Sequence, residues 1–354
     1  MKSIVPLSEA PRELVEQYLT ESTRYFRTHG PAAIGWKYYD AAFNRGRDRG
    51  YVWLRDGRVR GFIGLVPATI ARGDETRAFA WTCDWGLADP TASPGMGVRL
   101  LRQVLAGPGS VATCGGNHNT RSLVPRIAAR TVEDAGQYFW RPLTTGALLH
   151  LAADRAPALG RVARSPLGKL PIPWPLRRGR ARAIDGIDPA LDALIDRLGG
   201  RSGAAAGTSD PARWFVRYDV AHLEWALARC PGLRCGTVRV DGDRGPVAAA
   251  VWWYPESSPV RHVRFALWRE PGADDAARDV LGALVACARR AGGALISTVA
   301  EASDPALTSL FTRRTMLRRR APLPLYLLSP GVDSLGGLNY LAADLAQRFR
   351  GTAG

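Results

Sequence analysis

Two glycines stand where an extended apolar segment gives way to an amphipathic one, in "DWGLADPTASPGMGVRLLRQVL" (residues 84–105). Glycine accepts positive φ, so Gly95 and Gly97 suit a tight turn on geometry alone. A glycine loop that opens a helix also presents unpaired N–H groups at the positive end of the helix dipole, where phosphate binds. The segment therefore predicts either a tight turn or a phosphate site formed by the amides of Gly95, Met96, Gly97 and Val98.

Two side chains able to transfer protons flank this loop. Asp84 stands between Trp81 and Trp85, and a carboxylate among apolar rings suits a general base. His118 directly follows the next predicted strand, "VATCGGN", and imidazole exchanges protons near neutral pH. A paired strand carboxylate and a surface-turn histidine are the structural alternatives, and the residues alone leave both open.

The basic side chains of the chain are almost all arginine. Lys and Arg number 48 against 32 Asp and Glu, a net charge of +16, yet the lysines are only Lys2, Lys37 and Lys169. A GC-rich codon bias explains arginine in place of lysine but not the basic excess. A polyanionic partner such as tRNA therefore stays open, as does contact of a basic linker with a membrane surface.

The cysteine content and the hydropathy of the chain limit the class of protein to which it can belong. The five cysteines are odd in number, and Cys230 and Cys235 lack the neighbouring Cys or His that a zinc site requires, so we expect reduced structural thiols and no metal. No run of about 18 apolar residues predicts a membrane span, and the first residues become polar too early for a signal peptide. A cytoplasmic globular protein is the expectation.

The pattern of elements occurs twice along the chain. "GYVWLRDGRVRGFIGLVP" and "CGTVRVDGDRGPVAAAVWWYP" both indicate hairpins, with turns expected at the Asp-Gly pairs 56–57 and 241–242. Trp225 stands in the second copy where Trp36 stands in the first. The loop differs, because the second copy has "REPGADDAARDVL", whose aspartates suit a helix N-terminus but repel phosphate. An anionic cofactor is therefore expected in the first copy.

The two copies predict an α/β (mixed, α+β) fold of two tandem domains, each a mostly antiparallel central sheet flanked by helices. The expected ranges are 1–152 for an N-terminal ligand-binding domain, 153–183 for a Pro- and Arg-rich linker, 184–330 for a degenerate C-terminal copy, and 331–354 for a helical tail. Within the first copy we expect a helix over 121–132 and a final strand over 137–151.

The segment "ASPGMG" (residues 92–97) resembles the signature loop of the GNAT family, the Gcn5-related N-acetyltransferases, which is [Gln/Arg]-x-x-Gly-x-[Gly/Ala]. Gly95 and Gly97 match its two small positions, whereas Ala92 departs from Gln/Arg and Pro94 removes a backbone donor. "GWKYYDAAF" followed by "GRVRGFIGLVP" further resembles acyltransferases of bacterial polysaccharide gene clusters.

This resemblance implies transfer of an acyl group from acetyl-CoA or another acyl-CoA to an amine or hydroxyl of a small-molecule or saccharide acceptor. It implies that the pantetheine arm lies in a gap between the strand holding Asp84 and the strand "VATCGGN". The implied cofactor contacts are Trp85, Leu87, Gly95, Met96, Gly97, Val98, Asn117 and Asn119. The implied catalytic residues are Asp84, His118 and, in place of the family's usual tyrosine acid, Tyr138. Trp36, Tyr38 and Tyr39 would line the acceptor pocket, with a place in the core as the alternative.

Two other functions are consistent with the sequence. A Fem-type double-GNAT transferase takes its acyl group from charged tRNA, and the arginines near residues 313–320 would suit RNA phosphates. A non-catalytic member would bind an acyl-CoA or a partner, consistent with Ala92 and the missing tyrosine. The glycine loop favours an acyl-CoA enzyme with an active first domain and a degenerate second one.

Overall fold

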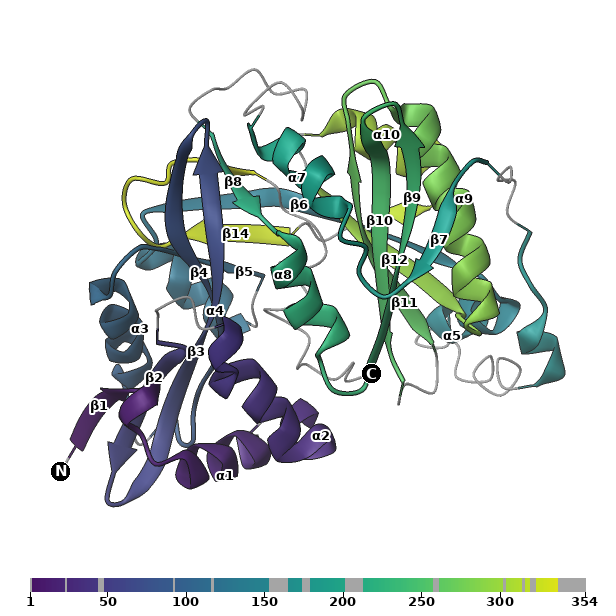
Figure 1. Cartoon of the computed structure of the whole chain (residues 1–354). Helices are drawn as coiled ribbons and strands as arrows, with labels where there is room; N and C mark the ends of the chain where they lie inside the picture. Colours follow the sequence, from purple (N-terminus) through teal and green to yellow (C-terminus); the bar gives the residue numbers. More distant parts are fainter. Residues whose placement is uncertain are drawn as a thin grey trace.

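The computed structural model describes residues 2–336 except 23, 44–47, 92, 116–117, 153–164, 174–178, 201–212, 257–260, 302–303, 314–315 and 319–322. The first repeat begins with the strand β1, which is followed by two helices and a hairpin (Figure 1). Its elements are β1 (Lys2–Pro6), η1 (Leu7–Glu9), α1 (Arg12–Ser22), α2 (Arg24–Ile34), η2 (Gly35–Tyr39), η3 (Ala41–Phe43), β2 (Gly50–Arg55), β3 (Arg58–Arg72), β4 (Glu75–Leu87), α3 (Met96–Ala106), β5 (Ser110–Cys114), α4 (His118–Leu123), η4 (Val124–Arg126), β6 (Arg130–Pro142) and α5 (Thr145–Ala152).

The second repeat has a similar order of elements, with the strand β8 between its first two helices. Its elements are η5 (Pro166–Lys169), β7 (Arg182–Asp185), α7 (Leu191–Gly200), β8 (Trp214–Arg217), α8 (Val220–Leu223), η6 (Glu224–Ala228), β9 (Leu233–Gly242), β10 (Gly245–Pro255), β11 (His262–Arg269), α9 (Asp274–Arg290), β12 (Leu295–Glu301), α10 (Pro305–Arg313), β13 (Leu317–Arg318), β14 (Leu323–Leu327) and β15 (Leu335–Gly336). The short π-helical turns η2 and η6 stand before the first long hairpin of each repeat, so the internal repeat read from the sequence is present in the structure.

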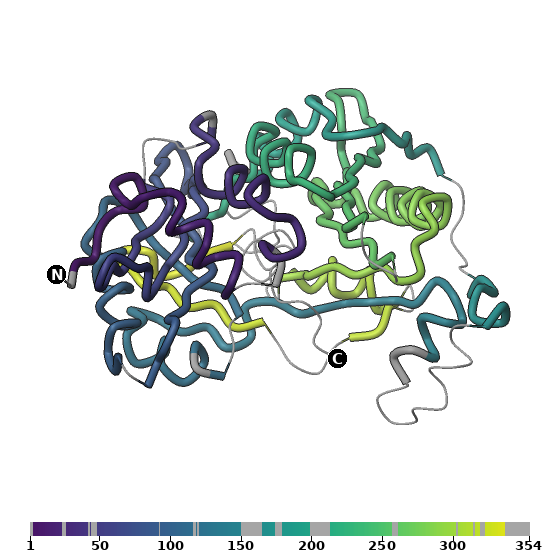
Figure 2. Tube along the Cα trace, turned by 90° about the horizontal axis from the view of Figure 1, so that it is seen from below, coloured from purple at the N-terminus to yellow at the C-terminus, as the bar shows by residue number. Residues whose placement is uncertain are grey.

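One continuous sheet runs through both repeats. Among the described residues its strand order is β1-β2-β3-β4-β5-β14-β6-β12-β11-β10-β9-β7. Strand β6 crosses from one repeat to the other (Figures 1 and 2), because residues 130–136 pair with β14 and residues 136–142 pair with β12. Strand β14, from the far end of the chain, lies between β5 and β6 and extends the sheet of the first repeat. The domain boundaries expected at 152, 183 and 330 remain predictions, and the repeats share strands across them.

Alternating side chains of the first-repeat strands pack against helices on opposite faces of the sheet. In β3, Phe62 and Val66 belong to the same buried cluster as the α1 residues Val15 and Leu19. The intervening Ile63 and Leu65 belong to another cluster, which includes Leu100, Leu101 and Val104 of α3. This period of two is what a strand buried on both faces requires. The mixed α/β fold, with a mostly antiparallel sheet flanked by helices, is therefore confirmed.

Three local predictions need correction. The helix expected over 121–132 ends at Arg126, and residues from Arg130 form β6, because β14 supplies them with a strand partner. Residues 145–151, expected as the end of a strand, belong to the helix α5, in line with their Ala- and Leu-rich sequence. In the second hairpin Gly242 pairs with Gly245, so the turn is at residues 243–244 rather than 241–242. The first turn, at 56–57, is confirmed, since Arg55 pairs with Arg58.

The expected linker and tail fall partly outside the described residues. Within 153–183, the structure describes η5 and the first residues of β7, which pairs with β9. Of the tail, residues 335–336 form β15, which pairs with β8. Residues 337–354, where a helix was expected, lie outside the described part of the chain.

Candidate active site in the first repeat

Glycine suits the two loop positions for different structural reasons. Gly95 is the N-cap of α3 and has φ 81°, a conformation that a side chain would strain. Gly97 lies inside the first helical turn, and a Cβ there would contact the indole of Trp85 at 3.5 Å. The first helical hydrogen bond of α3 joins the Arg99 N–H to the Gly95 carbonyl at 3.1 Å, so the amides of Gly97 and Val98 precede it. The first turn of α3 carries no acidic side chain.

Strands β4 and β5 separate in front of this helix. They pair over three residues only, from Phe79 with Ser110 to Trp81 with Ala112, while β4 continues to Leu87. On its other side β4 has a bulge, because Gly64 pairs with Cys83 and Phe62 pairs with Gly86. Two steps along β3 thus correspond to three along β4. The expected gap between the two strands is present, and the bulge lies beside it.

Asp84 stands at this bulge with φ 46°, one of two non-glycine residues with positive φ among the described residues. Its carboxylate points to the core side, where Oδ2 accepts a hydrogen bond from Lys37 Nζ at 2.6 Å and another from the Tyr38 hydroxyl. The side chains of Asp84 and Lys37 are 5% and 0% exposed. Asp84 as a whole is only half-buried, so its exposed surface belongs to the main chain. Its role as a general base remains a prediction, and its carboxylate is committed to a buried ion pair.

Tyr38 completes this cluster. Its ring is almost fully buried, and a Cβ at Gly64 of β3 would overlap the phenol hydroxyl, so glycine is needed there. Burial, together with the charge of Asp84, holds the pKa of the Tyr38 phenol well above its ordinary value of 10.0. Burial likewise raises the pKa of the neighbouring Cys83 thiol. Tyr38 is therefore a protonated hydrogen-bond donor over the physiological pH range.

The turn η2 that carries Lys37 also contacts the second repeat. Trp36 stacks on Trp225 of η6, with ring centroids 5.1 Å apart. The buried guanidinium of Arg49 donates to the Lys37 carbonyl and lies 4.8 Å from the Trp225 ring centroid. Burial lowers the pKa of Arg49 to about 10. Trp36 and Tyr38, expected in an acceptor pocket, thus both lie in the largest buried cluster of the protein, whereas Tyr39 is half-buried beneath the Arg12 guanidinium.

The other predicted site residues are dispersed. His118 is exposed at the first residue of α4 rather than in a turn. Asn117 lies outside the described residues, and the side chain of Asn119 does as well. Tyr138 pairs with Val299 on the half of β6 that joins the second repeat. Trp85, Leu87 and Met96 pack in the cluster that includes α3, beside the gap.

The second repeat lacks the bulge. Strand β11 pairs with β10 in unbroken register from Arg264 to Arg269. Strand β11 (His262–Arg269) carries no acidic residue, so Asp84 has no counterpart on it. The residue after Trp225 is Ala226, where Lys37 follows Trp36. The ion pair therefore has no counterpart in the second repeat.

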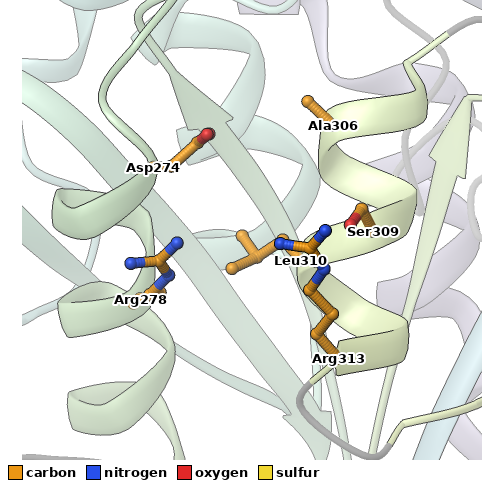
Figure 3. Close-up of a pocket in the computed structure, with 6 residues that line it drawn as sticks. All are labelled: Asp274, Arg278, Ala306, Ser309, Leu310 and Arg313. Carbon is orange, nitrogen blue, oxygen red and sulfur yellow. The ribbon is translucent and has the colours of Figure 1, made fainter.

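Charged side chains gather at the matching helix start in the second repeat. Asp274 and Asp275 open α9, and Asp274 Oδ1 lies 3.1 Å from Arg269 Nη1. Between α9 and α10 is a cavity of about 280 Å³, across which Arg278 and Arg313 face each other (Figure 3). Asp275 is the second residue of α9, where Gly97 is the second residue of α3, which agrees with the difference read from the sequence.

The chain is similar to known proteins in structure rather than in sequence. No family model matches the chain, and no curated protein matches its sequence. Solved structures do match: a GCN5-related N-acetyltransferase from Anabaena variabilis has a TM-score of 0.57 and 11% identity, over 93% of this chain and 73% of that one. A tandem GNAT protein from the clavulanic acid biosynthesis pathway has a TM-score of 0.55 and 14% identity, over 94% and 100%. The chain has the tandem GNAT fold.

The same fold extends to a further solved structure. N-myristoyltransferase of Saccharomyces cerevisiae, solved with bound myristoyl-CoA and inhibitors, has a TM-score of 0.58 and 10% identity, over 96% of this chain and 83% of that one. The GNAT resemblance drawn from "ASPGMG" is thus confirmed at the level of the fold. Among the described residues, no helix combines the length and the apolar character that crossing a bilayer requires.

Sequence reasoning missed Lys37 as a site residue. The signal was its composition, because a chain that uses arginine at 45 of 48 basic positions keeps lysine here. Arg49 was also missed, and no local pattern marks it.

Proposed function

We propose that the first repeat is an acyl-CoA-dependent acyltransferase that acts on an amine or hydroxyl of a small-molecule or saccharide acceptor. A strand gap is present in both repeats, since β11 and β12 also pair over three residues only. The observation that carries the proposal is that the gap coincides with a bulge beside it and an acid-free glycine helix start in the first repeat alone. The amides of Gly97 and Val98 would bind the pyrophosphate, and the free edge of β4 from Thr82 to Leu87 would pair with the pantetheine arm. The second repeat is proposed to be degenerate.

The chemistry of the bound acyl-CoA is that of a thioester, which an amine or hydroxyl attacks. The protein's contribution would be to hold the thioester at the β4 bulge and to bring the acceptor to it. His118 and Tyr138 remain candidates for proton transfer, and Trp36 and Tyr38 would support the site from the core rather than touch the acceptor.

Binding of the donor is the first test. Differential scanning fluorimetry with CoA, acetyl-CoA and myristoyl-CoA should show an increase in Tm, since a ligand at a hundredfold excess over Kd stabilises the folded state by about 2.7 kcal/mol. The longer donor is included because one structural neighbour binds myristoyl-CoA. No increase with any donor would contradict the proposal.

Substitution at the helix start locates the site. Gly97→Val would push a branched side chain against Trp85 and into the anion site, so it should raise KM for the acyl-CoA. Asp274→Asn, at the matching helix start, should leave KM unchanged. If both variants changed KM for the acyl-CoA equally, the assignment of the acyl-CoA site to the first repeat would be wrong.

The salt dependence of tRNA binding distinguishes the tRNA-dependent alternative from the acyl-CoA-dependent enzyme. Binding of a charged tRNA through the arginine-rich surface should have a steep salt dependence and persist at about 150 mM salt if it is functional. We expect tRNA binding to disappear at that concentration, while acyl-CoA binding remains.

A further inference from the structure

The Lys37–Asp84 ion pair has no place in the acyl-transfer chemistry described so far. It lies on the core side of β4, whereas the gap that would take the cofactor lies on the edge of that strand facing β5. Two opposite charges held 2.6 Å apart at nearly complete burial are not explained by stability alone, because apolar side chains of similar volume fill such places at least as well. The second repeat has Ala226 after Trp225 and no acidic residue on β11.

The pair coincides with the irregularity of the strand. Where the charged pair is present, β4 has a bulge and Asp84 has positive φ; where it is absent, β11 pairs in continuous register. A residue at positive φ persists only when its surroundings over-determine it. Lys37 and Tyr38 both bond to Asp84 Oδ2 and so fix its side chain from two directions.

Because the Asp84 side chain points toward the core, its peptide groups face away from the core. The carboxylate is 5% exposed, yet the residue as a whole is half-buried, so the main chain carries the accessible surface at the gap. Gly64 supports this arrangement from the neighbouring strand, since any side chain there would displace the Tyr38 hydroxyl.

The geometry points to Lys37 as a positioning residue of the first-repeat site: its ammonium holds Asp84 on the core side of β4 and thereby keeps the bulge and its main chain beside the gap between β4 and β5. This inference rests on the proposed acyl transfer for its catalytic consequence, but not for its structural one. It also gives the second repeat a role, because Trp225 and Arg49 fix the turn from which Lys37 projects.

The test compares Lys37→Met with Lys169→Met, a matched change at an exposed lysine of η5. Hydrogen–deuterium exchange of the peptide covering residues 82–87 reports on the bulge without requiring activity. We expect Lys37→Met to speed exchange there at least about tenfold, and to lower kcat at least about tenfold with little change in KM for the acyl-CoA. Lys169→Met should alter none of these quantities.

A double variant separates positioning from folding. Lys37→Met with Asp84→Leu replaces both buried charges with apolar side chains, so its Tm should return toward that of the wild type. Its exchange over residues 82–87 should nevertheless differ from the wild type, and kcat should stay low. A double variant with wild-type exchange and wild-type kcat would overturn the inference, as would Lys37→Met with both quantities unchanged.

The single variant also distinguishes positioning from direct base catalysis. If Asp84 acted only as a base on the acceptor, Lys37→Met would lower kcat by removing the charge beside the carboxylate, but exchange over residues 82–87 would stay at the wild-type rate. If the wild type binds no acyl-CoA, the proposed function fails, while the exchange measurement still decides whether Lys37 holds the bulge.

Discussion

Trp36 and Trp225 hold each other by reciprocal hydrogen bonds. The indole N–H of Trp36 donates to the Trp225 carbonyl at 2.7 Å, and the indole N–H of Trp225 donates to the Trp36 carbonyl at 3.3 Å. Each residue stands on a π-helical turn at the same place in its repeat. The contact therefore relates the two copies by an approximate two-fold symmetry. In the first copy it is one residue away from Lys37, so the interface and the support of the bulge share one turn.

Removing one side of this contact should destabilise both repeats together. Trp225→Ala leaves a cavity against Trp36 and Phe43, and the expected loss in free energy of unfolding is about 3–5 kcal/mol. Urea denaturation followed by far-UV circular dichroism measures it. Leu167→Ala, at a side chain 61% exposed, is the control and should change the value by less than about 0.5 kcal/mol. A separate early transition of the second repeat alone would show that the interface does not couple the copies.

The two glycines before the helices α3 and α9 offer a matched pair. Gly95 has φ 81° and Gly272 has φ 79°, and the space around each would admit a Cβ. Alanine at either position should therefore cost a similar 1–2 kcal/mol, roughly, from backbone strain alone. Only Gly95→Ala should also weaken binding of acyl-CoA, as measured by isothermal titration calorimetry. Equal binding by both variants would mean that Gly95 serves the turn and nothing else.

Neutralising Asp84 should be costly in a way that neutralising Asp274 is not. Asp84→Asn leaves the Lys37 ammonium buried without an opposite charge, and breaking a buried pair in this way costs about 3–5 kcal/mol. The Asp274 side chain is 47% exposed, so Asp274→Asn should cost less than about 1 kcal/mol. Thermal unfolding of both variants at the same pH is the measurement. Similar Tm values for the two would contradict the burial of the first pair.

Alkaline pH should destabilise the protein through Tyr38. Its pKa is raised in the folded state, so near and above pH 10.0 the unfolded chain loses the phenol proton while the folded protein keeps it. This contribution to stability is complete below pH 10.0 and decreases as the pH rises toward the folded-state pKa, by about 1.4 kcal/mol per pH unit for one proton. Tyr38→Phe should be less stable at pH 8 but should lose stability less steeply between pH 10 and 11. Parallel slopes for variant and wild type would refute this prediction.

Local sequence patterns determined the elements and the asymmetry between the copies. The Asp-Gly pair at 56–57 predicted a two-residue hairpin turn, and both residues do have positive φ. The loop around Gly95 predicted a strand-to-helix turn, and the aspartates from Asp274 onward predicted a second helix start without the glycine amides. These features depend on residues within a few positions of each other, so backbone preference and charge suffice to reveal them.

Only the tertiary structure decided which strands and side chains meet. Strand β14 reaches β5 and β6 from far along the chain, and the helix expected over 121–132 gave way to β6 because that partner arrives. Lys37 and Asp84 are 47 residues apart, and neither periodicity nor a motif links them. Packing determines which distant segments pair with each other. A hydrophobic period of two or 3.6 residues indicates the type of element but not which distant segment it will contact. The sequence by itself therefore determined two copies and their different loops, while packing decided that one copy holds a charged pair beneath its bulge.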